Sequence, residues 1–185
     1  MIEKIKQWDI DLFIYLNNSG IESLDGFWLF ITNTTVWIPL FALLLYLIFK
    51  AYETPKAKIV FLYFLGLVAL SLLLMALTKF SVARLRPNNL LEISEMIRIL
   101  KRPGGYSFYS GHASNSFAIA TFAYLVLRKK FSWIWLVFLF PFLFALSRIF
   151  VGVHFPSDLI FGAFMGCLLA FLFYKRCNTH LNALV

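Results

Sequence analysis

The sequence predicts an all-α protein, a polytopic membrane bundle of about five transmembrane helices, and two observations lead to this fold class. Of the 185 residues, 61% are hydrophobic and only 14% are charged, whereas soluble domains are about half apolar and about a quarter charged. The apolar residues gather in long segments, and basic residues stand at the segment ends. The length fits one membrane-embedded domain over residues 1–185.

Five apolar segments are the candidate spans. The first covers about residues 27–49, where the polar run 32–35 interrupts it and Pro39 is expected to kink it. That polar run either packs between helices or contacts a substrate. The last three segments are shorter than the ~20 residues of a full crossing, so their polar ends are expected to lie slightly inside the bilayer. The remaining segments are residues 59–78, 112–127, 133–145 and 159–174.

Two further helices are expected at the membrane surface. Residues 1–20 mix charged and apolar side chains and are too polar to span, which is typical of an interfacial amphipathic helix. A short surface helix is predicted near residues 90–100, within the polar loop 79–111, because four apolar residues recur there at helical spacing. These four are Leu90, Ile93, Ile97 and Leu100.

Basic residues are distributed unequally between the two expected membrane faces. One face receives the loops 50–58 and 128–130 and the tail from residue 175, with eight basic residues and one acidic residue, a net +7. The other face receives nine basic and eight acidic residues, a net +1. The positive-inside rule therefore makes the first face, and the C-terminus, cytoplasmic, and places the loop 79–111 on the outer face.

Composition also excludes other classes of protein. The net charge of +8 does not indicate a nucleic-acid partner, because the basic residues lie at segment ends instead of forming one basic face. Cys167 and Cys177 make neither a disulfide framework nor a metal-ligand spacing. The N-terminus lacks the basic-then-apolar order of a cleavable signal, so targeting is expected to rest on the first span.

Three polar clusters at the outer ends of the spans carry the candidate chemistry. In the first, Lys79 and Arg86 are seven residues apart and face one side if the helix continues, until Pro87 ends it. Two converging cations suit a phosphate, and arginine adds a bidentate fork. Alternatively, the same residues anchor a helix end at the interface.

The second cluster is Ser110-Gly111-His112, at the start of the third span. Ser110 is a good N-cap residue, and Gly111 lets the backbone approach a ligand closely. A helix N-terminus binds anions through its free N–H groups, and His112 would stand there ready to donate a proton. A capped helix with an interfacial histidine is the alternative interpretation.

The third cluster combines Arg148, His154 and Asp158 around Pro156, which suits the first turn of a helix. Asp158 would then reach the ring of His154, fix its tautomer and raise the nucleophilicity of the other ring nitrogen. A purely structural His–Asp pair is the alternative. Together the clusters supply an anion site, a carboxylate-backed nucleophile and a second imidazole, which is the inventory for phosphoryl transfer without a metal-ligand set.

These motifs resemble the signature of the type 2 phosphatidate phosphatase superfamily, which includes membrane lipid phosphatases, bacterial acid phosphatases and vanadium haloperoxidases. The matching residues are Lys79-(six residues)-Arg86-Pro87, Ser110-Gly111-His112 and Ser147-Arg148-(five residues)-His154-(three residues)-Asp158. One departure is Tyr109, which stands where the family usually has proline before the Ser-Gly-His triplet.

The resemblance implies a role for each matching residue. His154 would attack phosphorus and form a phosphohistidine, Asp158 would orient it, and His112 would protonate the leaving oxygen and later activate water. The phosphate oxygens would be held by Lys79, Arg86, Arg148, Ser110 and the Gly111 backbone. The resemblance implies neither a metal nor another cofactor.

The expected function is therefore removal of phosphate from a membrane lipid at the outer face of a bacterial plasma or inner membrane. Family substrates include phosphatidate, phosphatidylglycerophosphate, polyprenyl diphosphates and lipid A phosphates, and the sequence does not choose among them. The alternative is an anion transporter or lipid flippase that uses the basic cluster as its pocket. Transporters often show internal repeats and broken helices at mid-membrane, and no repeat is visible here. Halide chemistry has no support beyond the motifs.

Overall fold

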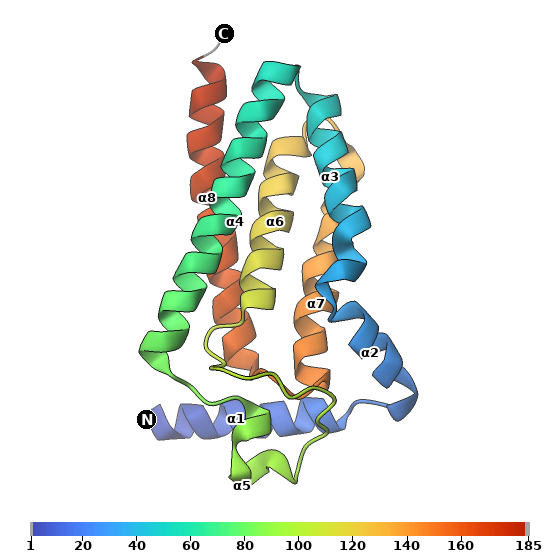
Figure 1. The fold of residues 1–185 in the computed structure, drawn as a ribbon, viewed down its shortest axis with the longest axis vertical. Helices are drawn as coiled ribbons and strands as arrows, with labels where there is room; N and C mark the ends of the chain where they lie inside the picture. Colours follow the sequence, from blue (N-terminus) through green and yellow to red (C-terminus); the bar gives the residue numbers. More distant parts are fainter. Residues whose placement is uncertain (1, 184–185) are drawn as a thin grey trace.

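The helices of this protein run side by side in a bundle, and one helix lies across the end of that bundle (Figure 1). The structure is a computed structural model, which describes residues 2–183, and within that range no β-strand occurs. The α-helices are α1 (Ile2–Asn18), α2 (Asp25–Ile31), α3 (Ile38–Ala51), α4 (Thr54–Val82), α5 (Leu91–Ser94), α6 (Gly111–Leu127), α7 (Leu139–Phe150) and α8 (Pro156–Asn182). The 3₁₀ turns are η1 (Glu22–Leu24), η2 (Thr34–Trp37), η3 (Pro87–Asn89) and η4 (Ser132–Phe138).

The predicted fold class, an all-α membrane bundle, is confirmed. Four stretches of the described chain are long and apolar enough to cross a membrane, and they are centred on α3, α4, α7 and α8. The 17-residue helix α6 is shorter but lies at the centre of the bundle, where ten of its residues are buried. Helix α1 lies across the bundle at one end, and the C-terminal end of α8 lies at the other (Figure 1).

Helices α6 and α8 pack closely because glycines on α8 leave room for the backbone of α6. A Cβ placed on Gly166 would lie 2.2 Å from the carbonyl oxygen of Ser114, and one on Gly162 would lie 2.7 Å from that of Ser110. Small residues allow such close approach between membrane helices, where van der Waals packing drives association. This contact fixes the start of α6 against the start of α8.

Replacing Gly166 with alanine should destabilise the bundle, because the added methyl group meets backbone atoms that cannot turn aside. We expect a loss of about 2 kcal/mol or more, as for other overpacked cores. Gly26→Ala is the matched control, since a Cβ there meets nothing within 4 Å. Thermal unfolding in detergent should show a lower midpoint for the first variant only, and equal midpoints would contradict this packing.

The first predicted span was wrong in its N-terminal third, because the chain breaks between α2 and α3. Asn33 is extended, and its side chain accepts a hydrogen bond from the Thr35 N–H (3.1 Å), which caps η2. Such side chains offer the backbone an alternative to helix. Pro39 causes no kink within a helix, because it lies in the first turn of α3, where its missing N–H costs nothing.

The surface helix predicted near residues 90–100 is helical only over Leu91–Ser94. Beyond it the backbone pairs with the end of α1. The Arg98 N–H donates to Asn17 Oδ1 (2.7 Å), and Asn17 Nδ2 donates to the Arg98 carbonyl (3.1 Å). The apolar residues in this stretch pack on α1 and on the end of α7 instead of forming one helical face.

The second and fifth spans extend beyond the predicted ranges 59–78 and 159–174. Helix α4 continues to Val82 and helix α8 begins at Pro156, so both carry polar residues in their last or first turns. Both helices therefore bring candidate site residues to the end of the bundle at which α1 lies (Figure 1).

Candidate active site

The structure places the residues of the three motifs at one end of the bundle, the end that α1 covers (Figure 1). Each residue lies at a helix terminus or in the loop next to one. Lys79 is in the last turn of α4, Ser110 caps α6, Gly111 and His112 begin α6, Arg148 is in the last turn of α7, and Arg86, His154 and Asp158 lie in or beside the connections that follow α4 and α7.

The chain turns sharply between α7 and α8, and this turn positions His154. Gly152 has φ +82°, and a Cβ there would lie 2.6 Å from the carbonyl oxygen of Arg98. Glycine therefore meets both the backbone conformation and the close approach. Pro156 then starts α8, as the sequence predicts. His154 consequently lies in the short loop between two buried helix ends.

Asp158 holds the His154 ring from the first turn of α8. Its Oδ2 lies 3.3 Å from His154 Nδ1 and accepts a hydrogen bond from the Phe155 N–H at 3.0 Å. The carboxylate thus caps α8 and contacts the ring at the same time. His154 is 2% exposed and Asp158 is 0% exposed. A buried carboxylate in this position is held rigidly and can orient an imidazole.

The other ring nitrogen, His154 Nε2, faces the guanidinium of Arg86 at 3.1 Å. Arginine can only donate, so Nε2 accepts and the ring proton lies on Nδ1, toward Asp158. Burial, followed by the charges of Arg148 and Arg86, lowers the pKa of His154 well below its ordinary value. The ring is therefore neutral at neutral pH and carries a lone pair on Nε2.

The sequence interpretation placed Lys79 and Arg86 on one side of a helix that continues to Arg86, but Arg86 lies beyond the end of α4. Helix α4 ends at Val82 because Ala83 adopts a left-handed conformation, with φ 49° and ψ 33°. The chain then runs extended to Arg86, which donates to the carbonyls of Val153 (3.1 Å) and Gly104 (3.2 Å). These bonds place the guanidinium over His154.

Two more cations, Arg148 and Lys79, lie close enough to His154 for their charges to act on its ring. Lys79 Nζ donates to the carbonyl of Tyr106 at 2.6 Å, which leaves further N–H donors on the ammonium group. Arg148 donates through Nη1 to the hydroxyl of Thr32, and its buried Nε has no hydrogen-bond partner among the described residues. A buried guanidinium N–H without a protein acceptor is suited to an oxyanion.

Ser110 and His112 form the side of the site contributed by α6. The Ser110 hydroxyl accepts a hydrogen bond from the Ala113 N–H (3.3 Å), so it caps α6 as predicted while its own proton remains free to donate. The His112 ring packs against Phe144, with the ring centroids 4.6 Å apart.

His112 also lines a cavity of about 500 Å³ between α3, α4, α6 and α7. Most of the lining is apolar, and its polar side chains are those of Thr34, His112, Asn115 and Ser116. The lining residues are Thr34, Phe41, Phe64, Val68, Leu72, Met75, Gly111, His112, Asn115, Ser116, Ile119, Phe140 and Phe144.

Sequence reasoning missed two groups that contact this site. Arg84 donates to Asp158 Oδ1 at 2.8 Å, although the spacing of the first motif, in which it lies, predicts no role for it. Thr32, from the polar run in the first predicted span, accepts a hydrogen bond from Arg148. Through this bond the polar run helps to position a residue that is a candidate for phosphate binding. Both assignments depend on how the chain folds back, which the spacing of residues does not reveal.

Tyr109, which stands where the family usually has proline, is buried and packs closely in the loop before α6. Tyr109 is 1% exposed, and its ring packs near those of Phe108 and Phe161, with centroids 6.1 and 5.6 Å away. The Ser110 N–H donates to the carbonyl of Asp158 at 3.1 Å. The loop before α6 is therefore tied directly to the start of α8.

Comparison with known proteins agrees with this arrangement. The model of the PAP2 superfamily matches residues 60–181, which include all three motifs. The lipid A 4'-phosphatase of Bacteroides thetaiotaomicron is 31% identical over 182 residues, covering 94% of this chain and 79% of that protein. The undecaprenyl-diphosphatase of Sulfolobus acidocaldarius is 31% identical over 169 residues, covering 89% and 76%.

A solved structure shows the same fold. The crystal structure of a transmembrane PAP2 type phosphatidylglycerolphosphate phosphatase from Bacillus subtilis has a TM-score of 0.75 against this chain. The two share 21% sequence identity, and the match covers 95% of this chain and 87% of that one.

Proposed function

The chain belongs to the PAP2 superfamily and is an integral membrane hydrolase of lipid phosphates; we propose that it works through a phosphohistidine at the outer face of a bacterial plasma or inner membrane, without a metal ion. The observation that carries this mechanism is the pair of contacts of His154. Nδ1 lies 3.3 Å from Asp158 and Nε2 lies 3.1 Å from Arg86. Nε2 thus carries a free lone pair, which faces the cationic side chains of the site.

In the first step, the Nε2 lone pair attacks phosphorus, a P–N bond forms, and the bond from phosphorus to the lipid oxygen breaks. His112 gives its proton to that leaving oxygen. The phosphorylated ring is cationic, and the Asp158 carboxylate beside Nδ1 compensates that charge. The charges on the transferring phosphoryl oxygens are stabilised by Lys79, Arg86 and Arg148.

In the second step, His112 takes a proton from water, and the oxygen of that water attacks the phosphohistidine. The P–N bond breaks, inorganic phosphate leaves, and Nε2 regains its lone pair. One histidine thus serves as acid and then as base, which requires it to stand near both the leaving oxygen and the entering water. The position of His112 in the wall of the cavity supports this role.

The apolar cavity supports a lipid substrate. It extends from His112 between the spanning helices, so a leaving group whose oxygen meets His112 would place its hydrocarbon chain among the phenylalanines of the lining. Burying such a chain contributes about 0.8 kcal/mol per CH₂ group. A water-soluble phosphate ester with the same reacting atoms cannot use this contribution.

We expect purified protein to release inorganic phosphate from phosphorylated lipids with a chelator present, and to act far more slowly on glycerol phosphate. The panel should include a lipid A phosphate and a polyprenyl diphosphate, since the relatives named above act on these classes, together with phosphatidate and phosphatidylglycerophosphate. Phosphate measured against time decides the outcome. Lipid movement across vesicles without any phosphate release would instead support the flippase alternative.

The proposed orientation predicts which loops an impermeant thiol reagent reaches. Arg102→Cys lies in the loop before α6, and Lys129→Cys lies in the loop after it; both positions are exposed. With Cys167 and Cys177 replaced by serine, the first variant should be labelled in intact spheroplasts and the second only after lysis. The reverse pattern would contradict an outward-facing site.

A further inference from the structure

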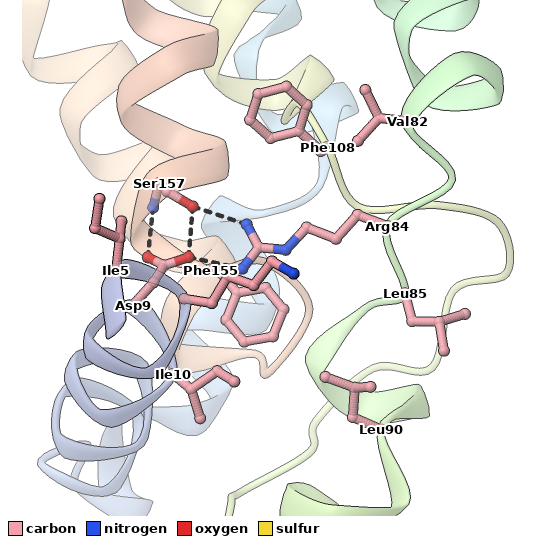
Figure 2. Close-up of a pocket in the computed structure, with 11 residues that line it drawn as sticks. Ile5, Asp9, Ile10, Val82, Arg84, Leu85, Leu90, Phe108, Phe155 and Ser157 are labelled. Carbon is pink, nitrogen blue, oxygen red and sulfur yellow. Dashed lines mark hydrogen bonds and ion pairs between the residues drawn. The ribbon is translucent and has the colours of Figure 1, made fainter. Parts of the chain in front are cut away.

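Asp9 is the residue through which the N-terminal helix α1 reaches the candidate active site. Its Oδ1 accepts a hydrogen bond from the Ser157 N–H (2.9 Å), and its Oδ2 accepts from the Ser157 hydroxyl (2.5 Å) and from Arg84 Nη2 (2.7 Å). Figure 2 shows these groups pointing toward one another from α1, the start of α8 and the segment after α4. The Asp9 side chain is only 11% exposed.

Arg84 joins Asp9 to the carboxylate beside the nucleophile. Its Nη1 donates to Asp158 Oδ1 (2.8 Å) and to the Ser157 hydroxyl (2.7 Å), while Nη2 is bonded to Asp9. The guanidinium also lies over the ring of Phe155, 4.0 Å from the centroid. One planar cation thus bridges two carboxylates in a fixed geometry.

The two oxygens of Asp158 therefore have separate duties. Oδ2 contacts His154 Nδ1 and the Phe155 N–H, whereas Oδ1 is held by Arg84. A carboxylate fixed at both oxygens cannot rotate away from the imidazole that it orients. Arg84 fixes Oδ1, and Asp9 in turn fixes Arg84. The orientation of the His154–Asp158 pair, the dyad, therefore depends on a side chain of α1.

A cavity of about 540 Å³ lies beside this cluster, between α1 and the end of α4 (Figure 2). Its wall is mainly apolar, with Ile5, Ile10, Val82 and Leu90 among the lining residues. The terminal nitrogens of Arg84 are bonded to protein carboxylates and to Ser157. Both terminal nitrogens of Arg84 therefore have protein acceptors, which is the pattern of a positioning network and not of a ligand site.

We propose that Asp9 and Arg84 are positioning residues for the hydrolysis, holding Asp158 and through it His154, so that the seating of α1 at the bilayer surface sets the geometry of the nucleophile. This inference rests on the proposed function of His154. Helix α1 carries exposed apolar side chains, including Trp8 and Tyr15, on surface that the bundle leaves uncovered. Such exposed apolar side chains suit contact with the bilayer surface, and the helix that carries them is the helix that supplies Asp9.

A double-mutant cycle on phosphate release by the full-length protein tests this proposal. Asp9→Asn should lower kcat about tenfold, and Arg84→Gln about 100-fold, with KM changed less than about twofold, because small displacements of a nucleophile reduce the chemical step. The double variant should be no slower than Arg84→Gln, since Asp9 acts through Arg84. Asp11→Asn is the matched control; Asp11 lies exposed on α1, and among the described residues its one side-chain hydrogen bond is with Gln7.

Conservative variants separate positioning from mere folding. Arg84→Lys keeps a cation next to Asp158 and should recover part of the kcat lost in Arg84→Gln. The proposal would be overturned if the kcat losses of the two single variants multiplied in the double variant, or if KM rose while kcat stayed unchanged. A lower thermal midpoint together with full kcat would overturn it as well. The wild type and Asp11→Asn show independently whether the protein releases phosphate at all, so failure of the proposed function is recognised separately.

Discussion

Replacing His154 with alanine should reduce phosphate release by about 10⁵-fold or more, as removal of a catalytic nucleophile does in hydrolases. The substitution removes the Nε2 lone pair that faces Arg86 at 3.1 Å and that is proposed to form the P–N bond. Initial rates on the best lipid of the panel, in detergent and with a chelator, measure the effect.

His180→Ala is the matched control for this experiment. His180 also lies on α8, but in its last turn, exposed and with its ring 6.1 Å from that of Tyr63, at the end of the bundle opposite the motifs. Its removal should leave the rate unchanged. Elution of both variants from size exclusion at the wild-type volume should show that each is folded. Turnover that survives His154→Ala would refute the phosphohistidine mechanism.

The dyad is the part of the site that the sequence predicts best, because its geometry is local. Pro156 marks the start of α8, and the four-residue spacing then brings Asp158 back to the ring of His154. Such a contact between the first turn of a helix and a residue just before it depends only on local geometry. The N-cap at Ser110 is predictable for the same reason, since capping involves residues only a few positions apart.

Arg84 and Asp9 escaped prediction because their contacts depend on long-range folding. Arg84 reaches Asp158 only because α4 ends with a left-handed residue at Ala83. Alanine seldom adopts this conformation, and no sequence pattern predicts it here. Asp9 lies 148 residues from Ser157 in the chain. Periodicity and motif spacing carry no information on which distant segments meet.

The error in the first span has a different cause. Hydropathy reports that a side chain avoids water, without saying whether lipid or protein covers it. Trp28 was counted as part of a membrane span, yet it lies on the short helix α2 and stacks on Phe150, with the ring centroids 4.3 Å apart. Its burial comes from the end of α7, so the apolar run included a segment that folds against the site.

Replacing His112 with glutamine should separate the two chemical steps. With a lipid substrate the rate should fall by about 10³-fold, within the range that general acid–base catalysis contributes, because an alkoxide leaves poorly without a proton. With para-nitrophenyl phosphate, whose phenolate leaves without protonation, formation of the phosphoenzyme should proceed at a rate close to that of the wild type. Hydrolysis of the phosphoenzyme should remain slow, because no base activates water.

The phosphohistidine should therefore accumulate on His154 in His112→Gln treated with the aryl phosphate, and mass spectrometry at alkaline pH should detect it there. Ser116→Ala is the matched control, since Ser116 lines the same cavity and, within residues 2–183, its hydroxyl donates only to the Ala113 carbonyl, one turn back on α6. It should turn over both substrates at normal rates without accumulating the intermediate. Equal losses on the two substrates, with no phosphorylated His154, would show that His112 does not act as the acid and base of this site.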